Sequence, residues 1–307
     1  MRTRDAVNSR FDSALDWGAL APLRLRARGA ADGLWAGPHR SLRRGAGVEF
    51  AGYREYSPGD DLRFLDRHAL MRHGVRVVRE FETDTDRSVR LVFDASASMG
   101  FSGSRAPGAK LAFAAVVGAA LGWVALRGGD RVALDWLGEG GGSPLPWGSG
   151  MPAFERLVHV LEDAEARGSV EPARLASLLT RLGRSSPSGS ITVFFSDFLD
   201  LPPNALEEIA ALAGRNRSVI AVQVLAPDEL DLPFGGPVRL RALESDLVVD
   251  TDAPRARAEY QAALARLSAT WRDGLVARGA RWLRSSTLEE PGTVVRRVLE
   301  SIAGAGS

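Results

Sequence analysis

Asp94, Ser96 and Ser98 form a D-x-S-x-S run directly behind the apolar stretch of residues 89–93. A magnesium ion takes six oxygen ligands in nearly octahedral geometry and gives up its waters reluctantly. Neutral hydroxyls combined with water-bridged carboxylates therefore suit this ion better than a dense acidic cage. The run predicts a site for a hard divalent cation and a function that works through it.

Two further positions can add oxygen ligands to this site. Asp197 follows the apolar stretch of residues 191–195, and the loop that precedes Pro172 can supply the hydroxyl of Ser169. In open α/β sheets, ligands bind outside the carboxyl ends of the strands, where the strand order reverses. If both apolar stretches are strands of one sheet, Asp94 and Asp197 are brought to the same edge of that sheet.

The elements that would position these residues follow from the hydrophobic pattern, which alternates short apolar runs with helical stretches from residue 88 onward. The predicted strands are residues 89–93, 131–136, 191–195, 218–225 and 281–283, with a small hairpin at 238–243 and 247–249; the predicted helices are residues 5–17, 20–33, 108–127, 152–167, 172–182, 203–213, 254–278 and 291–302. Strands that alternate with helices of this length indicate crossover units and a sheet covered on both faces. The predicted fold class is α/β, a doubly wound, mostly parallel sheet of Rossmann type.

The first part of the chain differs from this pattern. Its first 45 residues are Arg-rich and amphipathic, and the residues from 46 to 88 are charged and rich in turns. We therefore divide the chain into an N-terminal extension of residues 1–87, helical and turn-rich, and an α/β domain of residues 88–307.

Composition excludes several classes of function. Lys and Arg number 39 against 38 for Asp and Glu, so the chain has no basic field that would favour nucleic acid. DNA binding through the Arg-rich first 45 residues stays an alternative to a solvated helical face. The chain contains no Cys, which excludes disulfides and thiolate metal sites. The start of the chain lacks the apolar core of a signal peptide, and the apolar run of residues 111–126 is short for a membrane span. We expect a cytoplasmic protein without a membrane span.

The predicted ligand set resembles the metal-ion-dependent adhesion site of von Willebrand factor A domains. In that site a D-x-S-x-S run follows the first strand, a Thr or Ser lies in a middle loop, and an Asp follows a later strand. The resemblance implies that Ser96 and Ser98 bind Mg²⁺ directly, with Mn²⁺ or Ca²⁺ as possible substitutes. It implies that Asp94 and Asp197 act through water, and that Ser169 replaces the usual threonine. It also implies that a partner supplies a carboxylate to complete the ligand shell.

The segment of residues 47–63, together with residues 78–82, resembles the domain-of-unknown-function family fifty-eight (DUF58), whose members carry a von Willebrand factor A-like domain after such a segment. The similarity extends to residues 37–41 upstream and to residues 248–251 and Tyr260 downstream. One departure is Arg67, which stands where the family usually has Trp. The resemblance implies an adaptor or co-chaperone role beside a MoxR-type AAA+ ATPase, in the assembly or metal loading of a client complex.

Charged side chains surround the Pro58-Gly59 turn of this segment. They are Arg54, Glu55, Asp60 and Arg63. Their pattern fits either an ion-pair network that ties the segment to the sheet or a surface that binds a partner, and we take them as candidate partner-binding residues.

The main enzyme alternative is a metal-dependent phosphatase or other hydrolase that uses Asp94. Proteins similar to haloacid dehalogenases also place an Asp after the first strand, but they need a second Asp two residues later and a Lys further along the chain. Position 96 is Ser, and the only lysine, Lys110, comes too early in the sequence for that role. The chain also lacks a G-x-S-x-G elbow and a G-x-x-x-x-G-K phosphate loop. We therefore expect a non-enzymatic, metal-dependent interaction module.

Overall fold

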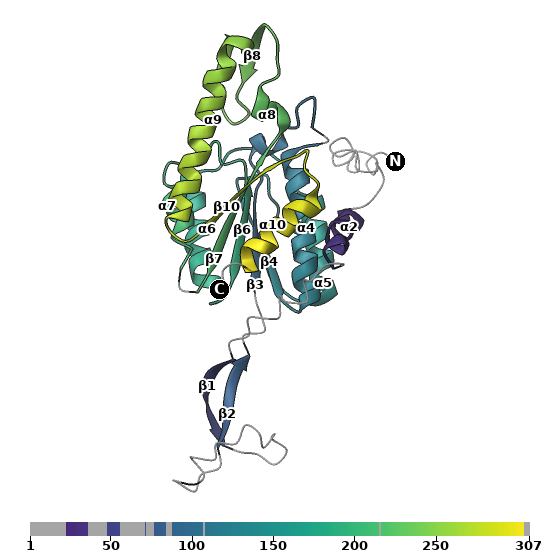
Figure 1. Cartoon of the computed structure of the whole chain (residues 1–307), viewed down its shortest axis with the longest axis vertical. Helices are drawn as coiled ribbons and strands as arrows, with labels where there is room; N and C mark the ends of the chain where they lie inside the picture. The colour runs from purple at the N-terminus through teal and green to yellow at the C-terminus, as the bar shows by residue number, and fades with distance from the viewer. Residues whose placement is uncertain are drawn as a thin grey trace.

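The computed structural model describes residues 23–35, 48–55, 71, 77–83, 88–106, 108–214 and 216–303 (Figure 1). The strands are β1 (Val48–Glu55), β2 (Val77–Thr83), β3 (Ser88–Asp94), β4 (Arg131–Leu137), β5 (Leu145–Gly148), β6 (Ile191–Ser196), β7 (Ser218–Leu225), β8 (Pro237–Arg241), β9 (Val248–Asp252) and β10 (Arg281–Ser286). The helices are α2 (Leu23–Trp35), α4 (Lys110–Gly128), α5 (Gly150–Glu162), α6 (Pro172–Ser185), α7 (Ala205–Ala210), α8 (Pro227–Asp231), α9 (Ala253–Val276) and α10 (Pro291–Ala303), with a short 3-10 turn, η2 (Ala97–Gly100).

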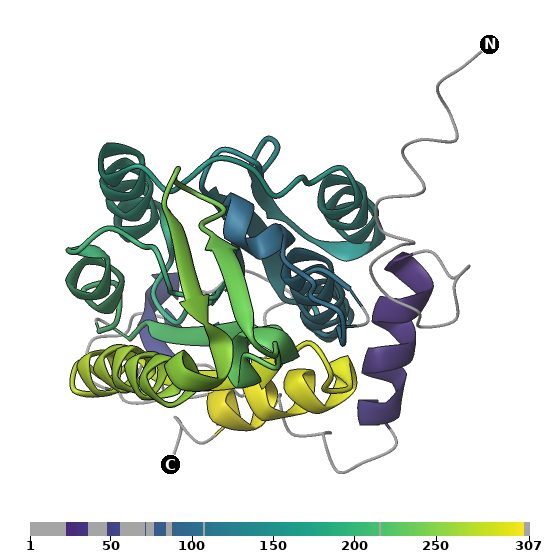
Figure 2. The same ribbon diagram turned by 90° about the horizontal axis from the view of Figure 1, so that it is seen from above.

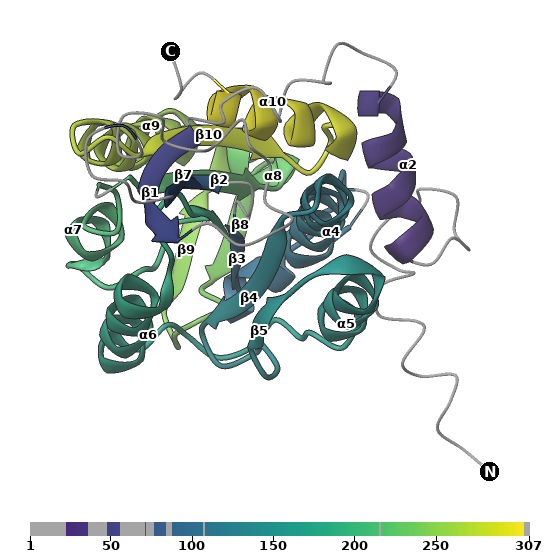
Figure 3. The same ribbon diagram turned by 90° about the horizontal axis from the view of Figure 1, so that it is seen from below.

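A six-stranded sheet in the order β10-β7-β6-β3-β4-β5 forms the centre of the fold. All neighbouring strands are parallel except β5, which runs antiparallel to β4. Helices α2, α4, α5 and α10 pack on one face of the sheet, and α6, α7 and α9 pack on the other (Figure 3). Every residue of β3 is buried, as expected for a parallel strand covered on both faces. The prediction of a doubly wound, mostly parallel α/β sheet is confirmed.

The strand order reverses at β3. From β3 the chain first adds β4 on one side and later adds β6 on the other side. Because the two crossovers leave in opposite directions, the carboxyl ends of β3 and β6 form the switch point at which open α/β sheets bind ligands, and we call this edge the crevice. This is the edge to which the sequence assigns Asp94 and Asp197.

Helix α4 is the central helix of the core. It is apolar on all sides, and by length and composition it is the one helix among the described residues that could cross a membrane, although 89% of its most apolar window is buried inside the fold. Two glycines let it approach its neighbours closely: a Cβ at Gly118 would lie 2.3 Å from the Phe93 ring, and one at Gly122 would lie 2.4 Å from Leu157. The apolar run therefore serves as the packing layer behind the crevice.

Several elements differ from the sequence-based predictions. Strands β1 and β2 pair as an antiparallel hairpin, in a region expected to consist of charged turns, and this hairpin lies apart from the sheet (Figure 1). Strand β5 and helix α8 were not predicted, because both are short and contain proline. The helix predicted to reach residue 167 ends at Glu162.

The N-terminal part of the chain is described only in pieces. The helix predicted at residues 5–17 lies outside the described residues, whereas the helix predicted at 20–33 is present as α2. Leu23, Ala27 and Ala31 of α2 are buried against α4 and α10. Helix α2 thus belongs to the same hydrophobic core as the sheet, and the division between residues 87 and 88 stays a prediction.

Candidate metal centre

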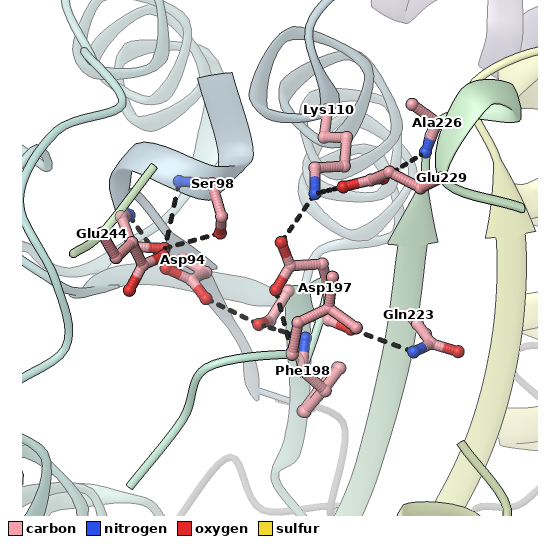
Figure 4. A network of polar contacts seen from close by, with 12 residues as sticks. Asp94, Ser98, Lys110, Asp197, Phe198, Gln223, Ala226, Glu229 and Glu244 are labelled. Atoms are coloured by element: carbon pink, nitrogen blue, oxygen red, sulfur yellow. Dashed lines mark hydrogen bonds and ion pairs between the residues drawn. The ribbon is translucent and has the colours of Figure 1, made fainter. Parts of the chain in front are cut away.

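Asp94 and Asp197 lie together at the crevice, as the sequence predicts (Figure 4). Asp94 is the last residue of β3, Asp197 follows β6, and the two side chains are 1% and 2% exposed. The Asp94 carboxylate accepts hydrogen bonds from the Ser96 backbone N–H (2.9 Å) and from the Ser196 hydroxyl (2.6 Å). Burial, reinforced by the charge of Asp197, raises the pKa of Asp94 to about 7, although hydrogen bonds from Ser196 and Ser96 lower it.

Ser196 is a site residue that the sequence pattern does not single out. It ends β6 and is fully buried, and its hydroxyl also accepts a hydrogen bond from the Phe198 N–H (2.9 Å). The register of β3 against β6, Phe93 opposite Phe195, brings Ser196 beside Asp94. That register is the signal that could have identified it.

The hydroxyls of Ser96 and Ser98 point toward each other. Their Oγ atoms are 3.3 Å apart, and both residues are buried. Adjacent ligands of an octahedral Mg²⁺ ion, each about 2.1 Å from the metal, lie about 3 Å apart. The two hydroxyls are therefore spaced as neighbouring ligands of one ion would be.

The backbone of the D-x-S-x-S run is fixed by the loop of residues 163–171 between α5 and α6. The Ala97 N–H donates to the Gly168 carbonyl (2.9 Å), and the Arg167 N–H donates to the Ala95 carbonyl (2.9 Å). Gly140 fits between this loop and the D-x-S-x-S run only because it has no side chain, since a Cβ there would lie 1.9 Å from the Glu165 carbonyl oxygen and 2.3 Å from the Ala95 carbonyl oxygen. The glycine-rich turn after β4 thus supports the site as well as ending the β4–β5 hairpin.

Ser169 follows Gly168 in this supporting loop. It is half-buried, and in the described part of the chain its hydroxyl makes no hydrogen bond. The structure places Ser169 next to Gly168, whose carbonyl accepts the hydrogen bond from Ala97, while the role of Ser169 as a ligand stays a prediction.

Lys110 enters the site from the first turn of α4. Its side chain is completely buried, and its Nζ lies 2.6 Å from Asp197 Oδ2 and 2.6 Å from Glu229 Oε1. Burial lowers the pKa of Lys110, but the charges of Asp197 and Glu229 outweigh burial and raise it. Burial also raises the pKa of Glu229, although Lys110 lowers it. Lys110 comes too early in the sequence for the lysine of a phosphatase, and the sequence pattern does not include it in the site. It lies there because α4 begins at the carboxyl end of β3.

Glu244 is the residue that the sequence pattern missed altogether. It lies in the turn between β8 and β9, and its Oε1 accepts a hydrogen bond from the Ser98 backbone N–H (3.3 Å) (Figure 4). Burial raises the pKa of Glu244, although hydrogen bonds from Ser98 and Ser96 lower it. A carboxylate from a distant hairpin therefore touches the D-x-S-x-S run.

Four carboxylates line the site: Asp197 and Glu229 pair with Lys110, Asp94 is affected by the charge of Asp197, and Glu244 accepts from the Ser98 N–H. The pKa values of Asp94, Glu229 and Glu244 are raised, in each case chiefly by burial. A bound divalent cation would offset this excess of negative charge. In the described ranges, no three His, Asp or Glu side chains are grouped to hold a metal ion. The available ligand set therefore consists of hydroxyls supplemented by carboxylates, which fits Mg²⁺.

The predicted partner-binding residues are described only in part. Arg54 and Glu55 lie at the end of β1, where they pair with Val78 and Val77 of β2. Asp60 and Arg63 lie outside the described residues. Their role stays a prediction.

Comparison with known proteins identifies the family. The model of the family described as "Protein of unknown function DUF58" matches residues 52–270. The chain belongs to the DUF58 family. This DUF58 chain is also 30% identical, over 256 residues, to the uncharacterized proteins Mb1516 of Mycobacterium bovis and Rv1480 of Mycobacterium tuberculosis. Each alignment covers 81% of this chain and 80% of the relative.

Two solved structures show distant similarity to this DUF58 chain. An aerotolerance-related membrane protein from Bacteroides fragilis is 15% identical with a TM-score of 0.47, and the match covers 71% of this chain and 99% of that protein. A von Willebrand factor type A protein from Catenulispora acidiphila is 14% identical with a TM-score of 0.38, and the match covers 75% of this chain and 44% of that protein. TM-scores this low support no conclusion about function.

Proposed function

We propose that this chain is a non-enzymatic protein-interaction module whose binding site is completed by Mg²⁺. The observation that carries the proposal is the pair of buried hydroxyls, Ser96 and Ser98, 3.3 Å apart in the crevice that also holds Asp94 and Asp197. The hydroxyls would bind the ion directly, and the two carboxylates would hold its water ligands. Mn²⁺ or Ca²⁺ could take the place of Mg²⁺.

A site of this composition suits binding better than hydrolysis. Both oxygens of Asp94 already accept hydrogen bonds, and the side chain is 1% exposed, so it is poorly placed to attack a phosphoester. The residue two positions later is Ser96, where a phosphatase of this kind needs a second carboxylate. Hydroxyl ligands add no charge to the ion, which leaves it attractive to a carboxylate from another protein.

The partner that we propose is a MoxR-type AAA+ ATPase with its client protein, in the cytoplasm. Support for this partner comes from the DUF58 family alone. A co-expressed ATPase of this type is expected to co-purify with the chain in Mg²⁺ and to be lost when EDTA removes the metal. Co-purification that is indifferent to EDTA would contradict a metal-dependent contact.

Isothermal titration with Mg²⁺ tests the metal site. The wild-type chain is expected to bind one ion, and the double variant Ser96→Ala/Ser98→Ala is expected to lose binding while keeping its circular dichroism spectrum. The matched control is Ser186→Ala/Ser190→Ala, which removes two buried hydroxyls near the opposite end of β6 that make no hydrogen bond within the described residues. Equal Mg²⁺ binding by both double variants would refute the site.

The enzyme alternative is tested on the same proteins. A phosphatase would hydrolyse a generic phosphoester such as p-nitrophenyl phosphate and would lose that activity in Asp94→Asn. We expect no turnover above background for either protein. Turnover by the wild-type chain that disappears in Asp94→Asn would show that the protein is a hydrolase and would contradict the proposal of a non-enzymatic module.

A further inference from the structure

The hairpin of β8 and β9 lies across the carboxyl edge of the sheet and brings its tip to the candidate metal centre. Seen from above, the light green hairpin reaches over the sheet toward the blue segment that follows β3 (Figure 2). At its tip, Glu244 Oε1 accepts a hydrogen bond from the Ser98 N–H (3.3 Å). The hairpin and the D-x-S-x-S run are 146 residues apart in sequence, so this contact is a product of the tertiary fold.

The hairpin is held at its base by backbone hydrogen bonds, and apolar side chains near its tip are exposed. The Ala253 N–H donates to the Gly236 carbonyl (3.0 Å), and Asp252 caps α9. Gly236 has a φ of +69° and, like Gly235, has open space around its Cβ position, so the chain can pivot there. Four apolar side chains near the tip are exposed: Leu243, Leu247, Val248 and Val249. An isolated two-stranded hairpin is marginally stable, so a contact at the tip contributes substantially to its position.

The serine ligands are closed off while the hairpin lies over them. Ser96 is 1% exposed and Ser98 is 7% exposed. A carboxylate from another protein therefore cannot reach these residues in this conformation. Apart from Asp94 of the same run, the carboxylate that contacts them is that of Glu244.

We infer that Glu244 occupies the position in which a partner's carboxylate would complete the metal's ligand shell, so that the β8–β9 hairpin is a tethered competitor of the partner. The inference rests on the proposed metal-dependent binding function and adds its regulation and the chemistry of its partner. The partner must present an acidic side chain and must displace the hairpin. A tethered group acts at an effective concentration of about millimolar or more, so only a partner that also gains other contacts displaces it.

The hairpin contact is tested first without metal, by hydrogen exchange on the full chain. Glu244→Gln is expected to speed exchange of the hairpin amides about tenfold or more, because the hydrogen bond to a charged acceptor is weakened. Glu244→Asp keeps the charge but shortens the side chain, and should have a similar effect. The control Asp246→Asn removes one negative charge from the same exposed turn and should leave exchange unchanged. Equal exchange in Glu244→Gln, Asp246→Asn and wild type would overturn the inference.

The position in the ligand shell is tested with Mg²⁺ and acetate. In Glu244→Gln, replacing chloride by acetate at equal ionic strength is expected to raise Mg²⁺ affinity several-fold, because free carboxylate can enter the position left by Glu244. In wild type and in Asp246→Asn, acetate should have no effect on Mg²⁺ affinity. If acetate acts equally on all three proteins, or on none of them, Glu244 does not hold that position.

Failure of the metal site and failure of the competitor role of the hairpin give different results. Absence of Mg²⁺ binding to wild type, or unchanged binding in Ser96→Ala/Ser98→Ala, refutes the metal site of the proposed function. The metal-free exchange experiment still decides whether Glu244 holds the hairpin closed. Normal Mg²⁺ binding with no response to Glu244→Gln in either experiment refutes only the competitor role of the hairpin.

Discussion

Replacing Asp94 by Asn should stabilise the metal-free protein at neutral and alkaline pH. Burial and the charge of Asp197 raise the pKa of Asp94 from 3.8 to about 7. Each pKa unit corresponds to about 1.4 kcal/mol, so ionising Asp94 costs the metal-free fold up to about 4 kcal/mol near pH 8. Asn has nearly the same shape and carries no charge, and it avoids this cost.

The sign of the pH dependence follows from the raised pKa. The folded state keeps the Asp94 proton up to about pH 7, whereas the unfolded chain loses it near pH 4. The contribution of Asp94 to the free energy of unfolding is therefore fully present below about pH 4 and is lost as the pH rises through about 7. The stability difference between Asp94→Asn and wild type should be near zero at pH 4 and grow to about 2–4 kcal/mol at pH 8, with the variant more stable.

Urea unfolding in EDTA at a series of pH values measures this difference. The control is Glu259→Gln, which removes a carboxylate from an exposed position on α9 and should change the free energy of unfolding by less than about 0.5 kcal/mol throughout the series. Adding Mg²⁺ should reverse the order at pH 8, because the ion favours ionised Asp94 and the variant has lost that charge. A difference that shrinks with rising pH, or one that is constant across the range, would refute the reasoning.

Two further substitutions test the surroundings of the site. Lys110→Met should lower the free energy of unfolding by about 3–5 kcal/mol, because it leaves Asp197 and Glu229 buried without their ammonium partner. Its control in the same urea titration is Arg239→Met, which breaks an exposed ion pair and should have almost no effect. Gly140→Ala should destabilise the fold by about 1–3 kcal/mol and weaken Mg²⁺ binding in calorimetry, because its Cβ would collide with backbone beneath the D-x-S-x-S run. Gly142→Ala, where nothing lies within 4 Å of the new Cβ, is its control and should match wild type.

The part of the site that the sequence predicts is the part fixed by the sheet. Asp94 and Asp197 each follow a run of buried apolar residues, and the carboxyl ends of parallel strands meet at one edge whatever the lengths of the connections. Strand order adds that β3 and β6 are neighbours, which makes the two acids adjacent. Hydrophobic periodicity therefore suffices for these residues, because it reports which segments are strands and where each one ends.

Lys110 and Glu244 could not be placed by the same reasoning. Whether the first turn of α4 faces the crevice depends on the path of residues 101–109, which has no periodic pattern to read. The hairpin was predicted near its observed position, but its direction over the sheet depends on the geometry at Gly235, Gly236 and the start of α9. The backbone conformation of individual residues such as these cannot be predicted from the pattern of apolar residues.

These two residues change what the D-x-S-x-S run can do. Lys110 neutralises Asp197 in part, so the centre keeps fewer free charges than its acidic residues alone suggest. A cation held mainly by hydroxyls keeps most of its own charge and attracts a further carboxylate. Glu244 supplies that carboxylate from within the chain, and it does so through a hairpin whose base can pivot and whose tip is otherwise exposed. If the proposed function holds, the affinity of the site for another protein would be set by how easily the hairpin leaves, as well as by the residues that would hold the metal.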